Sequence, residues 1–154
     1  MTTYFLDTSA IIKHYFPEQG HVRVNNLYDP KGKHDLYISQ IALVEVVASI
    51  CRKAREQNIM EDARDALINA FRRDSQKTYS IQRVMNATYI AAGNLCRVHR
   101  LRAYDAMQLA CALRLREKSI SNEPLVPTFV CADNQFVMIA VKEGLSVENP
   151  NNHP

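Results

Sequence analysis

The segment Thr3-Tyr4-Phe5-Leu6-Asp7-Thr8-Ser9-Ala10-Ile11-Ile12 decides the fold of this chain. Its first four residues are mostly apolar, which predicts a short strand buried on both faces. Asp7 ends that run, and Thr8-Ser9 opens a helix that we expect to reach about Tyr15. A buried strand that passes directly into a helix is typical of a parallel sheet covered by helices.

The same alternation continues along the chain. Further strands are expected at Leu36–Ile38, Thr78–Ser80, Thr128–Ala132 and, as an edge strand, Ser146–Glu148. Helices are expected at Pro17–Tyr28, Gln40–Glu56 with Ser39 as N-cap, Met60–Asp74, Val84–Val98, Ala103–Arg116 and Gln135–Glu143. The periodicity predicts these inward-facing residues in the third and fourth of those helices: Ala63, Leu67, Ala70 and Phe71, then Val84, Ala87, Ala91, Leu95 and Val98. We therefore predict an α/β protein, a three-layer α/β/α arrangement with a central parallel sheet.

The length and composition fit one soluble domain. The 154 residues suffice for a full hydrophobic core, and we expect a single domain over 1–148 with a loose C-terminal tail at 149–154. The stretch 119–127 is expected to be the least structured. No run approaches the ~20 apolar residues of a membrane span, so we expect a cytoplasmic protein with no membrane partner. Four cysteines without a C-x-x-C pair are expected to be small buried hydrophobes in a reduced compartment: Cys51, Cys96, Cys111 and Cys131.

Four acids are each isolated in an otherwise apolar segment: Asp7, Glu45, Asp105 and Asp133. A buried charge without a partner is costly, so four of them in one small domain suggest one shared cause. Asp7 and Asp133 follow predicted strands, whereas Glu45 and Asp105 lie early in predicted helices, so all four are expected at the carboxyl edge of the sheet. Carboxylates gathered there raise one another's pKa values unless a cation is present. Mg²⁺ or Mn²⁺ suits such an all-oxygen site and promotes phosphodiester hydrolysis.

Each acid also has a purely structural explanation. Asp7 fits a helix N-cap, and Asp133-Asn134 fits a turn. Glu45 has Arg52 and Arg55 as possible ion-pair partners, and Asp105 has Arg102 or simply its place in a first helical turn. The joint pattern favours a shared site over four separate explanations.

The net charge is only +3, which by itself does not indicate a nucleic-acid partner. The positions of several arginines next to the predicted acids are a better indication of a basic surface that could bind one. Arg97, Arg100 and Arg102 precede Asp105, and Arg52 follows Glu45 with further cations beside it. Both groups suit contact with a phosphate backbone, and both equally suit solvated helix ends. Tyr104 suits either stacking on a base or packing in the core.

Four motifs in this order resemble the PIN domain family, and within it the VapC-type toxins of toxin–antitoxin pairs. They are Phe5-Leu6-Asp7-Thr8-Ser9-Ala10-Ile11-Ile12, Ser39-x5-Glu45, Leu101-Arg102-Ala103-Tyr104-Asp105-Ala106, and Val130-Cys131-Ala132-Asp133-Asn134-x-Phe136 followed by Ala140 and Gly144-Leu145. The resemblance covers nearly the whole chain.

The resemblance implies a Mg²⁺- or Mn²⁺-dependent endoribonuclease that acts on RNA, forms a homodimer and is inhibited by a small antitoxin protein. It implies Asp7, Glu45, Asp105 and Asp133 as the catalytic acids, with Asp7 and Asp105 as direct metal ligands. It also implies that Ser9 and Asn134 assist the site. A non-catalytic PIN-like RNA-binding or assembly subunit and an acidic-pocket signalling domain remain as alternatives.

Overall fold

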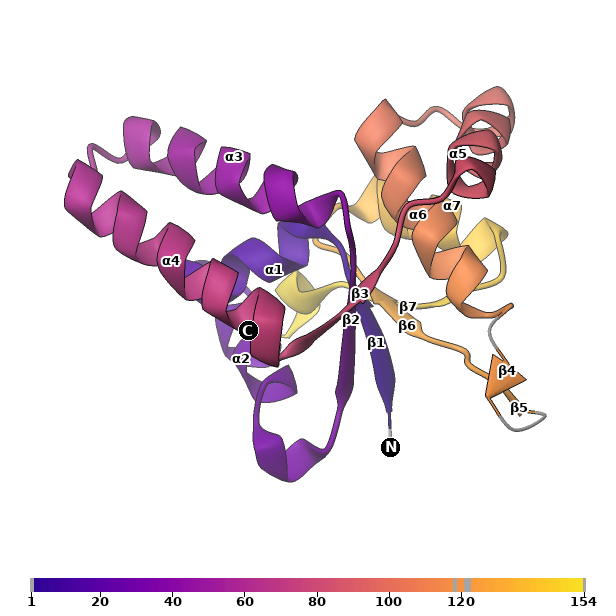
Figure 1. Cartoon of the computed structure of the whole chain (residues 1–154), viewed down its shortest axis with the longest axis horizontal. Helices are drawn as coiled ribbons and strands as arrows, with labels where there is room; N and C mark the ends of the chain where they lie inside the picture. The colour runs from indigo at the N-terminus through magenta and orange to yellow at the C-terminus, as the bar shows by residue number, and fades with distance from the viewer. Residues whose placement is uncertain (1, 118, 121–122, 154) are drawn as a thin grey trace.

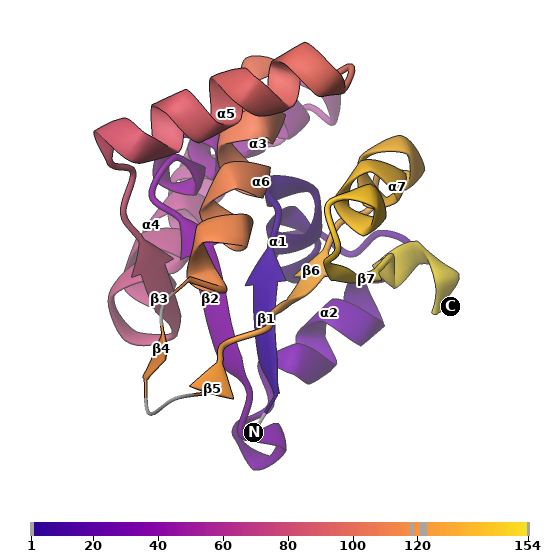
Figure 2. The ribbon, with the colours of Figure 1, turned by 90° about the vertical axis from the view of Figure 1, so that its right-hand side faces the viewer.

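A parallel five-stranded sheet forms the centre of the protein. The structure, a computed structural model, describes residues 2–117, 119–120 and 123–153. The strands are β1 (Thr3–Leu6), β2 (Asp35–Ser39), β3 (Tyr79–Gln82), β6 (Thr128–Val130) and β7 (Ser146–Glu148). Their order is β3-β2-β1-β6-β7 and every pairing is parallel, which confirms the predicted sheet. Figure 2 shows β1 running toward the end of the sheet at which α1 begins.

Helices cover the sheet on both sides, as Figure 1 shows. One side carries α1 (Thr8–Tyr15), α2 (His21–Leu27), α3 (Ala42–Glu56) and α4 (Glu61–Lys77). The other carries α5 (Asn86–Val98), α6 (Ala103–Leu115) and α7 (Asn134–Lys142). Successive side chains of a strand point to opposite faces of the sheet, so the hydrophobic core has two halves. In β1, Tyr4 and Leu6 pack with α1 and α3, whereas Phe5 between them packs with α6. The three-layer α/β/α prediction is confirmed.

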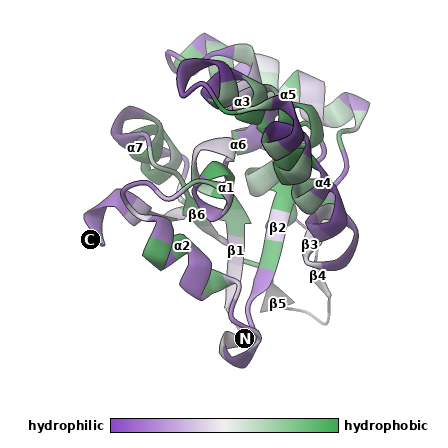
Figure 3. Cartoon of the chain, turned by 90° about the vertical axis from the view of Figure 1, so that its left-hand side faces the viewer, coloured by the Kyte–Doolittle hydropathy of each residue, from purple (hydrophilic) through white to green (hydrophobic). Residues whose placement is uncertain are grey.

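Hydropathy follows this layering. In Figure 3 much of β2 is hydrophobic, whereas the outer helices α2 and α4 mix hydrophobic with hydrophilic residues. Within the described part of the chain no helix combines the length and the apolar character that a bilayer crossing requires.

Two predicted inward faces are correct only in part: Phe71 and Leu95 are buried as expected, and Leu67, Val84 and Ala91 are partly buried against the core. In α4 the buried residues are Ile68 and Phe71, and Ala63 is exposed. In α5 they are Thr88, Ala92 and Leu95, while Ala87 and Val98 face solvent. These helices pack mainly against a neighbouring helix, α4 on α3 and α5 on α6, so a narrow contact sets their rotation and not the full apolar stripe. The hydroxyl of Thr88 also accepts a hydrogen bond from the Met85 N–H, which turns this polar residue inward at the helix start.

Several boundaries differ for local reasons. The α2 helix begins at His21 and not at Pro17, since its N-cap is Gly20 with a φ of +83°. Ser39 ends β2, and its hydroxyl accepts from the Ile41 N–H, so Ile41 is the N-cap of α3. The strand β6 ends at Val130, two residues before the predicted end. Cys96 is exposed, in contrast to the expectation for all four cysteines, because it lies on the outer face of α5.

The chain is more ordered between its main elements than expected. Short 3₁₀ turns occur at η1 (Pro30–Gly32) and η2 (Pro150–Asn152). Two-residue strands β4 (Ser119–Ile120) and β5 (Glu123–Pro124) pair antiparallel within the stretch expected to be the least structured; residues 121–122 within it and residue 118 at its border lie outside the described residues. Residues 149–153 do not form a loose tail. Asn149 and Pro150 are buried, and the Asn151 carbonyl accepts a hydrogen bond from Gln19.

Replacing Gly20 with alanine is expected to destabilise the protein by about 1–3 kcal/mol. Its φ of +83° disfavours any side chain, and an added Cβ would lie 2.8 Å from the carbonyl carbon of Pro150. Gly93→Ala is the matched control, because nothing lies within 4 Å of that Cβ site in α5. The control is expected to gain up to about 1 kcal/mol from helix propensity. Urea unfolding measures both, and equal effects of the two substitutions would contradict the packing of η2 on the turn at Gly20.

Candidate functional site

Two of the four acids cap helices at the carboxyl edge of neighbouring parallel strands. Asp7 directly follows β1 and is the N-cap of α1, and Asp133 follows β6 and is the N-cap of α7. The Asp133 carboxylate accepts from the backbone N–H groups of Gln135 and Phe136 at 2.9 and 3.1 Å. The structural explanation of both residues as caps is therefore correct, and it also aims both carboxylates at one edge of the sheet.

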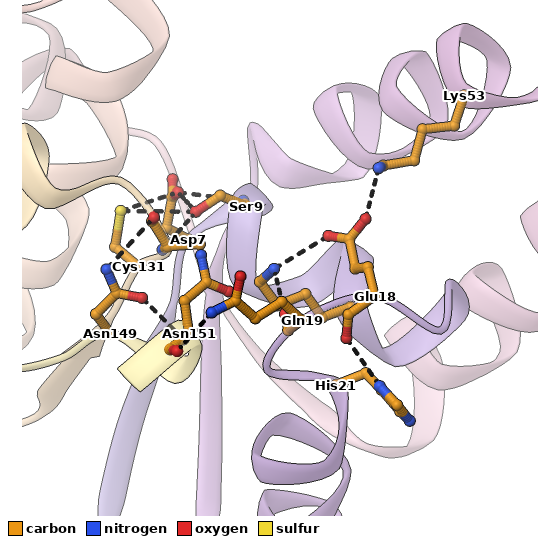
Figure 4. Close-up of polar contacts among 11 residues, drawn as sticks. Asp7, Ser9, Glu18, Gln19, His21, Lys53, Cys131, Asn149 and Asn151 are labelled. Carbon is orange, nitrogen blue, oxygen red and sulfur yellow. Dashed lines mark hydrogen bonds and ion pairs between the residues drawn. The ribbon is translucent and has the colours of Figure 1, made fainter. Parts of the chain in front are cut away.

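Asp7 is held by the residue two positions after it. Only 4% of Asp7 is exposed, and its Oδ2 accepts from the backbone N–H and the hydroxyl of Ser9 at 3.1 and 2.6 Å. Burial raises the pKa of Asp7, the hydrogen bonds from Ser9 oppose that rise, and the charge of Glu45 adds to it. The Ser9 hydroxyl also accepts from the Ala132 N–H at 2.9 Å, which joins the first turn of α1 to the loop before Asp133. Figure 4 shows Ser9 and Cys131 beside Asp7.

Glu45, in the first turn of α3, is held by side chains from two other helices. Its Oε2 accepts from the hydroxyl of Thr8 at 2.8 Å and from the amide of Gln108. Gln108 also donates to the Thr8 hydroxyl at 2.6 Å, so a single buried amide links α6 to both α1 and α3. The predicted ion pair of Glu45 with an arginine is absent among the described residues, where Arg52 pairs with Glu56 instead.

Asp105 lies where the electric fields of the other three acids overlap. It sits half-buried in the first turn of α6. Its pKa is raised to about 6, chiefly by burial and then by the charges of Asp7, Glu45 and Asp133, while the charge of Arg102 opposes the rise. Arg102 therefore acts on Asp105 through its charge, without a direct ion pair in the described residues.

The acids open onto a cleft of about 1280 Å³. All four predicted acids line it, together with these cations: Lys13, Arg52, Lys53, Arg100, Arg102 and Lys142. Two other predicted site residues lie elsewhere. Arg97 is not in the cleft wall, and Asn134 accepts a hydrogen bond from Asn149 at 2.7 Å, which ties it to the C-terminal segment. Tyr104 is 53% exposed, so core packing is the wrong explanation for it.

The donor set suits a hard divalent cation, since it consists of carboxylate oxygens from four elements that already repel one another. Across the described ranges, no three acidic, histidine or cysteine side chains stand together as a closed ligand set. Hydrogen bonds from Ser9, from Thr8 and Gln108, and from backbone N–H groups instead hold three of the carboxylates.

Sequence reasoning missed Thr8, Gln108 and Lys13. Gln108 carried a usable signal, because it is the one uncharged polar side chain within the apolar run from Ala106 to Leu113. Lys13 carried one too, because it is a charged residue at an inward position of the first helix and is only 5% exposed.

A parallel α/β sheet with an acid-lined cleft at its carboxyl edge, flanked by cations, defines the class of protein. The chain belongs to the PIN domain family, whose sequence profile matches residues 4–129. Two solved structures share its fold, each at 16% identity. One is VapBC2 from Rickettsia felis bound to a DNA fragment from its promoter, with a TM-score of 0.64 over 96% of this chain and 98% of that chain. The other is FitAcB from Neisseria gonorrhoeae, with a TM-score of 0.59 over 98% and 99%. A search of curated proteins found no match.

The raised pKa of Asp105 predicts a pH-dependent loss of stability in the presence of chelator. Its ordinary value is 3.8, and in the folded protein it is about 6. Between these values the unfolded chain releases the proton first, so the contribution of Asp105 is fully present below about pH 4 and is lost as the pH rises through about 6. Urea unfolding of the wild type and of Asp105→Asn from about pH 4 to 7 measures this. The free energy of unfolding should shift in favour of the variant as the pH rises, and parallel pH profiles would contradict it.

Gln108→Glu tests the link between α6 and Glu45. The substitution keeps the shape of the side chain but places a carboxylate where an amide now donates to Glu45. We expect a loss of about 2 kcal/mol or more near neutral pH, because a donor is lost and a like charge is added. The loss should shrink toward pH 5, where protonation restores a donor. A pH-independent loss would show that Gln108 only fills space.

Proposed function

We propose that this protein is a Mg²⁺- or Mn²⁺-dependent endoribonuclease that hydrolyses RNA phosphodiester bonds. The observation that carries the proposal is the convergence of Asp7, Glu45, Asp105 and Asp133 on one cleft, where burial and then the charges of the other three acids raise the pKa of Asp105. That convergence attracts a divalent cation, and the cationic walls of the same cleft attract a polyanion. PIN domains are in general nucleases and are typically dependent on divalent metal, which supports the same chemistry.

In this proposal Asp7 and Asp105 are direct metal ligands, and Glu45 and Asp133 complete the site directly or through water. A divalent ion bound there supplies Lewis acidity toward the phosphate and activates water. Ser9 keeps the Asp7 carboxylate turned into the site. Thr8 and Gln108 do the same for Glu45. Because Gln108 is buried and these hydrogen bonds tie α1, α3 and α6 together, the carboxylates lose little conformational freedom when a cation enters.

The cations of the cleft position the strand. Arg100 and Arg102, between α5 and α6, and Arg52 in α3 contact backbone phosphates on either side of the acids. Since water is the attacking group, no 2′-hydroxyl takes part in the chemistry. Each cut therefore leaves a 5′-phosphate and a free 3′-hydroxyl.

We further propose that the protein is a cytoplasmic VapC-type toxin that forms a homodimer and is inhibited by a small antitoxin protein. The shared fold with VapBC2 and FitAcB supports a paired partner. Co-expression with the neighbouring reading frame and joint purification would test the partner. Light scattering would test the dimer.

Asp7→Asn and Asp105→Asn are each expected to lower the rate of RNA cleavage by at least about 100-fold, because each removes a metal ligand. Asp62→Asn, at an exposed acid in the first turn of α4, is the control and should cleave like the wild type. Chelator should stop cleavage and Mn²⁺ should restore it. Enzymatic ligation that requires a 5′-phosphate identifies the product ends.

A 2′,3′-cyclic phosphate at the product ends would refute hydrolysis by water. RNA binding without cleavage by the wild-type protein under any divalent cation would favour the alternative of a non-catalytic RNA-binding subunit.

A further inference from the structure

Glu18 bridges two lysines at one end of the cleft. It lies in the connection between α1 and α2, and its two carboxylate oxygens accept from different helices. Lys13 Nζ of α1 lies 3.1 Å from Oε1, and Lys53 Nζ of α3 lies 2.6 Å from Oε2. All three residues line the same cleft as Asp7 and Glu45. In Figure 4 Glu18 points toward Lys53, and Asp7 lies apart from both, beside Ser9.

Both ammonium groups are fixed before any ligand arrives. The Lys13 side chain is 6% exposed, and its Nζ also donates to the carbonyl of Gln19 at 2.7 Å. Lys53 Nζ lies 5.5 Å from the ring centroid of Phe16, where a cation–π interaction restrains it. A lysine normally has considerable rotamer freedom to lose on binding, and here most of that loss has already occurred on folding.

The carboxylate of Glu18 allows the positively charged ammonium groups of Lys13 and Lys53 to lie close together. Two ammonium groups on the same carboxylate repel each other, and the negative charge of Glu18 between them offsets that repulsion. Burial opposes ionisation of Glu18, but the hydrogen bonds and charges of Lys53 and Lys13 outweigh it and place the Glu18 pKa below its ordinary value. The group therefore carries a net charge of +1 at neutral pH.

A purely structural role explains only part of this arrangement. An ion-pair link between the α1–α2 connection and α3 accounts for Glu18. It does not account for a nearly buried ammonium on the wall of a cleft, since apolar residues of similar volume often stabilise such positions as well or better. Among the described residues Lys13 Nζ has two acceptors and Lys53 Nζ has one, so N–H donors remain on both for a ligand.

We propose that Lys13 and Lys53, held together by Glu18, form a binding site for a backbone phosphate of the RNA strand, next to the phosphate that lies at the carboxylates. The proposal rests on the proposed function, because it assigns the path of the same substrate. Lys13 follows Asp7 by six residues of α1, or about 9 Å along the helix axis, which suits a neighbouring phosphate of one strand. Arg100 and Arg102 approach the acids from the α5–α6 connection, so the strand crosses the site between two cationic walls.

The test is the salt dependence of RNA binding, measured with chelator on the non-cleaving Asp105→Asn background. A fluorescent single-stranded RNA is titrated at several salt concentrations with Lys53→Gln, Lys53→Arg and Lys77→Gln added separately. Lys53→Gln should weaken binding about tenfold at low salt, the value of one charged hydrogen bond. It should also lower the slope of log affinity against log salt by about 0.7, the value for one phosphate contact of a single strand.

Lys53→Arg keeps the charge and should retain the wild-type slope. Lys77→Gln removes an exposed lysine at the end of α4, outside the cleft, and should change neither quantity. Lys13→Gln should act like Lys53→Gln. Lys13 is nearly buried, so Lys13→Gln could prevent folding. In that case the result for Lys53→Gln alone tests the phosphate site, because Lys53 is more exposed.

An unchanged slope in Lys53→Gln, or an equal change in Lys77→Gln, would overturn the phosphate site while leaving RNA cleavage by the wild type intact. Conversely, if the wild type cleaves no RNA but Lys53→Gln still lowers the slope, the endoribonuclease proposal fails and the phosphate site stands.

Discussion

Repulsion among carboxylates at the carboxyl edge of a parallel sheet is the constraint around which this protein is organised. The four acids come from four separate elements, and beyond the effect of burial the charges of Asp7, Glu45 and Asp133 raise the energy of charging Asp105. Chain topology makes this unavoidable, since β1 and β6 are neighbours and the residues that follow them emerge side by side. The remaining features of the cleft are ways of holding these charges in place.

Hydrogen bonds do most of this holding. Ser9 supports Asp7, backbone N–H groups support Asp133, and Thr8 with Gln108 supports Glu45. Asp7, Asp105 and Asp133 also lie at or near helix N-termini, where the free N–H groups favour negative charge. The cations around the cleft add a long-range field without neutralising the acids directly, since Lys13 and Lys53 are engaged by Glu18. The result is an acidic centre between basic walls, a charge pattern that suits a metal and a polyanion together.

The sheet, the helix order and the gathering of the acids were all predictable because they depend on local pattern. Apolar runs of four or five residues predict buried strands, and the position of Asp7 after such a run places it at the sheet edge. The rotation of α4 and α5 was not predictable, because each buries only a narrow strip against a neighbouring helix. Nor was the order of residues 149–153, where Asn149 is held by side-chain hydrogen bonds to Ala132 and Asn134.

The amino-acid sequence alone determined which acids lie together and which edge of the sheet receives them, since both follow from residue type and from strand–helix alternation. Only the tertiary structure decided which partner holds each charge. From the sequence, Glu45 could equally have paired with a neighbouring arginine, whereas in the structure it accepts a hydrogen bond from Gln108. Nothing in the sequence indicated that Lys13 and Lys53 would both pair with Glu18. The physical reason is that hydrogen bonds and ion pairs depend on distances of about 3 Å between residues far apart in the chain. Periodicity determines the faces of helices and strands, but packing sets those distances.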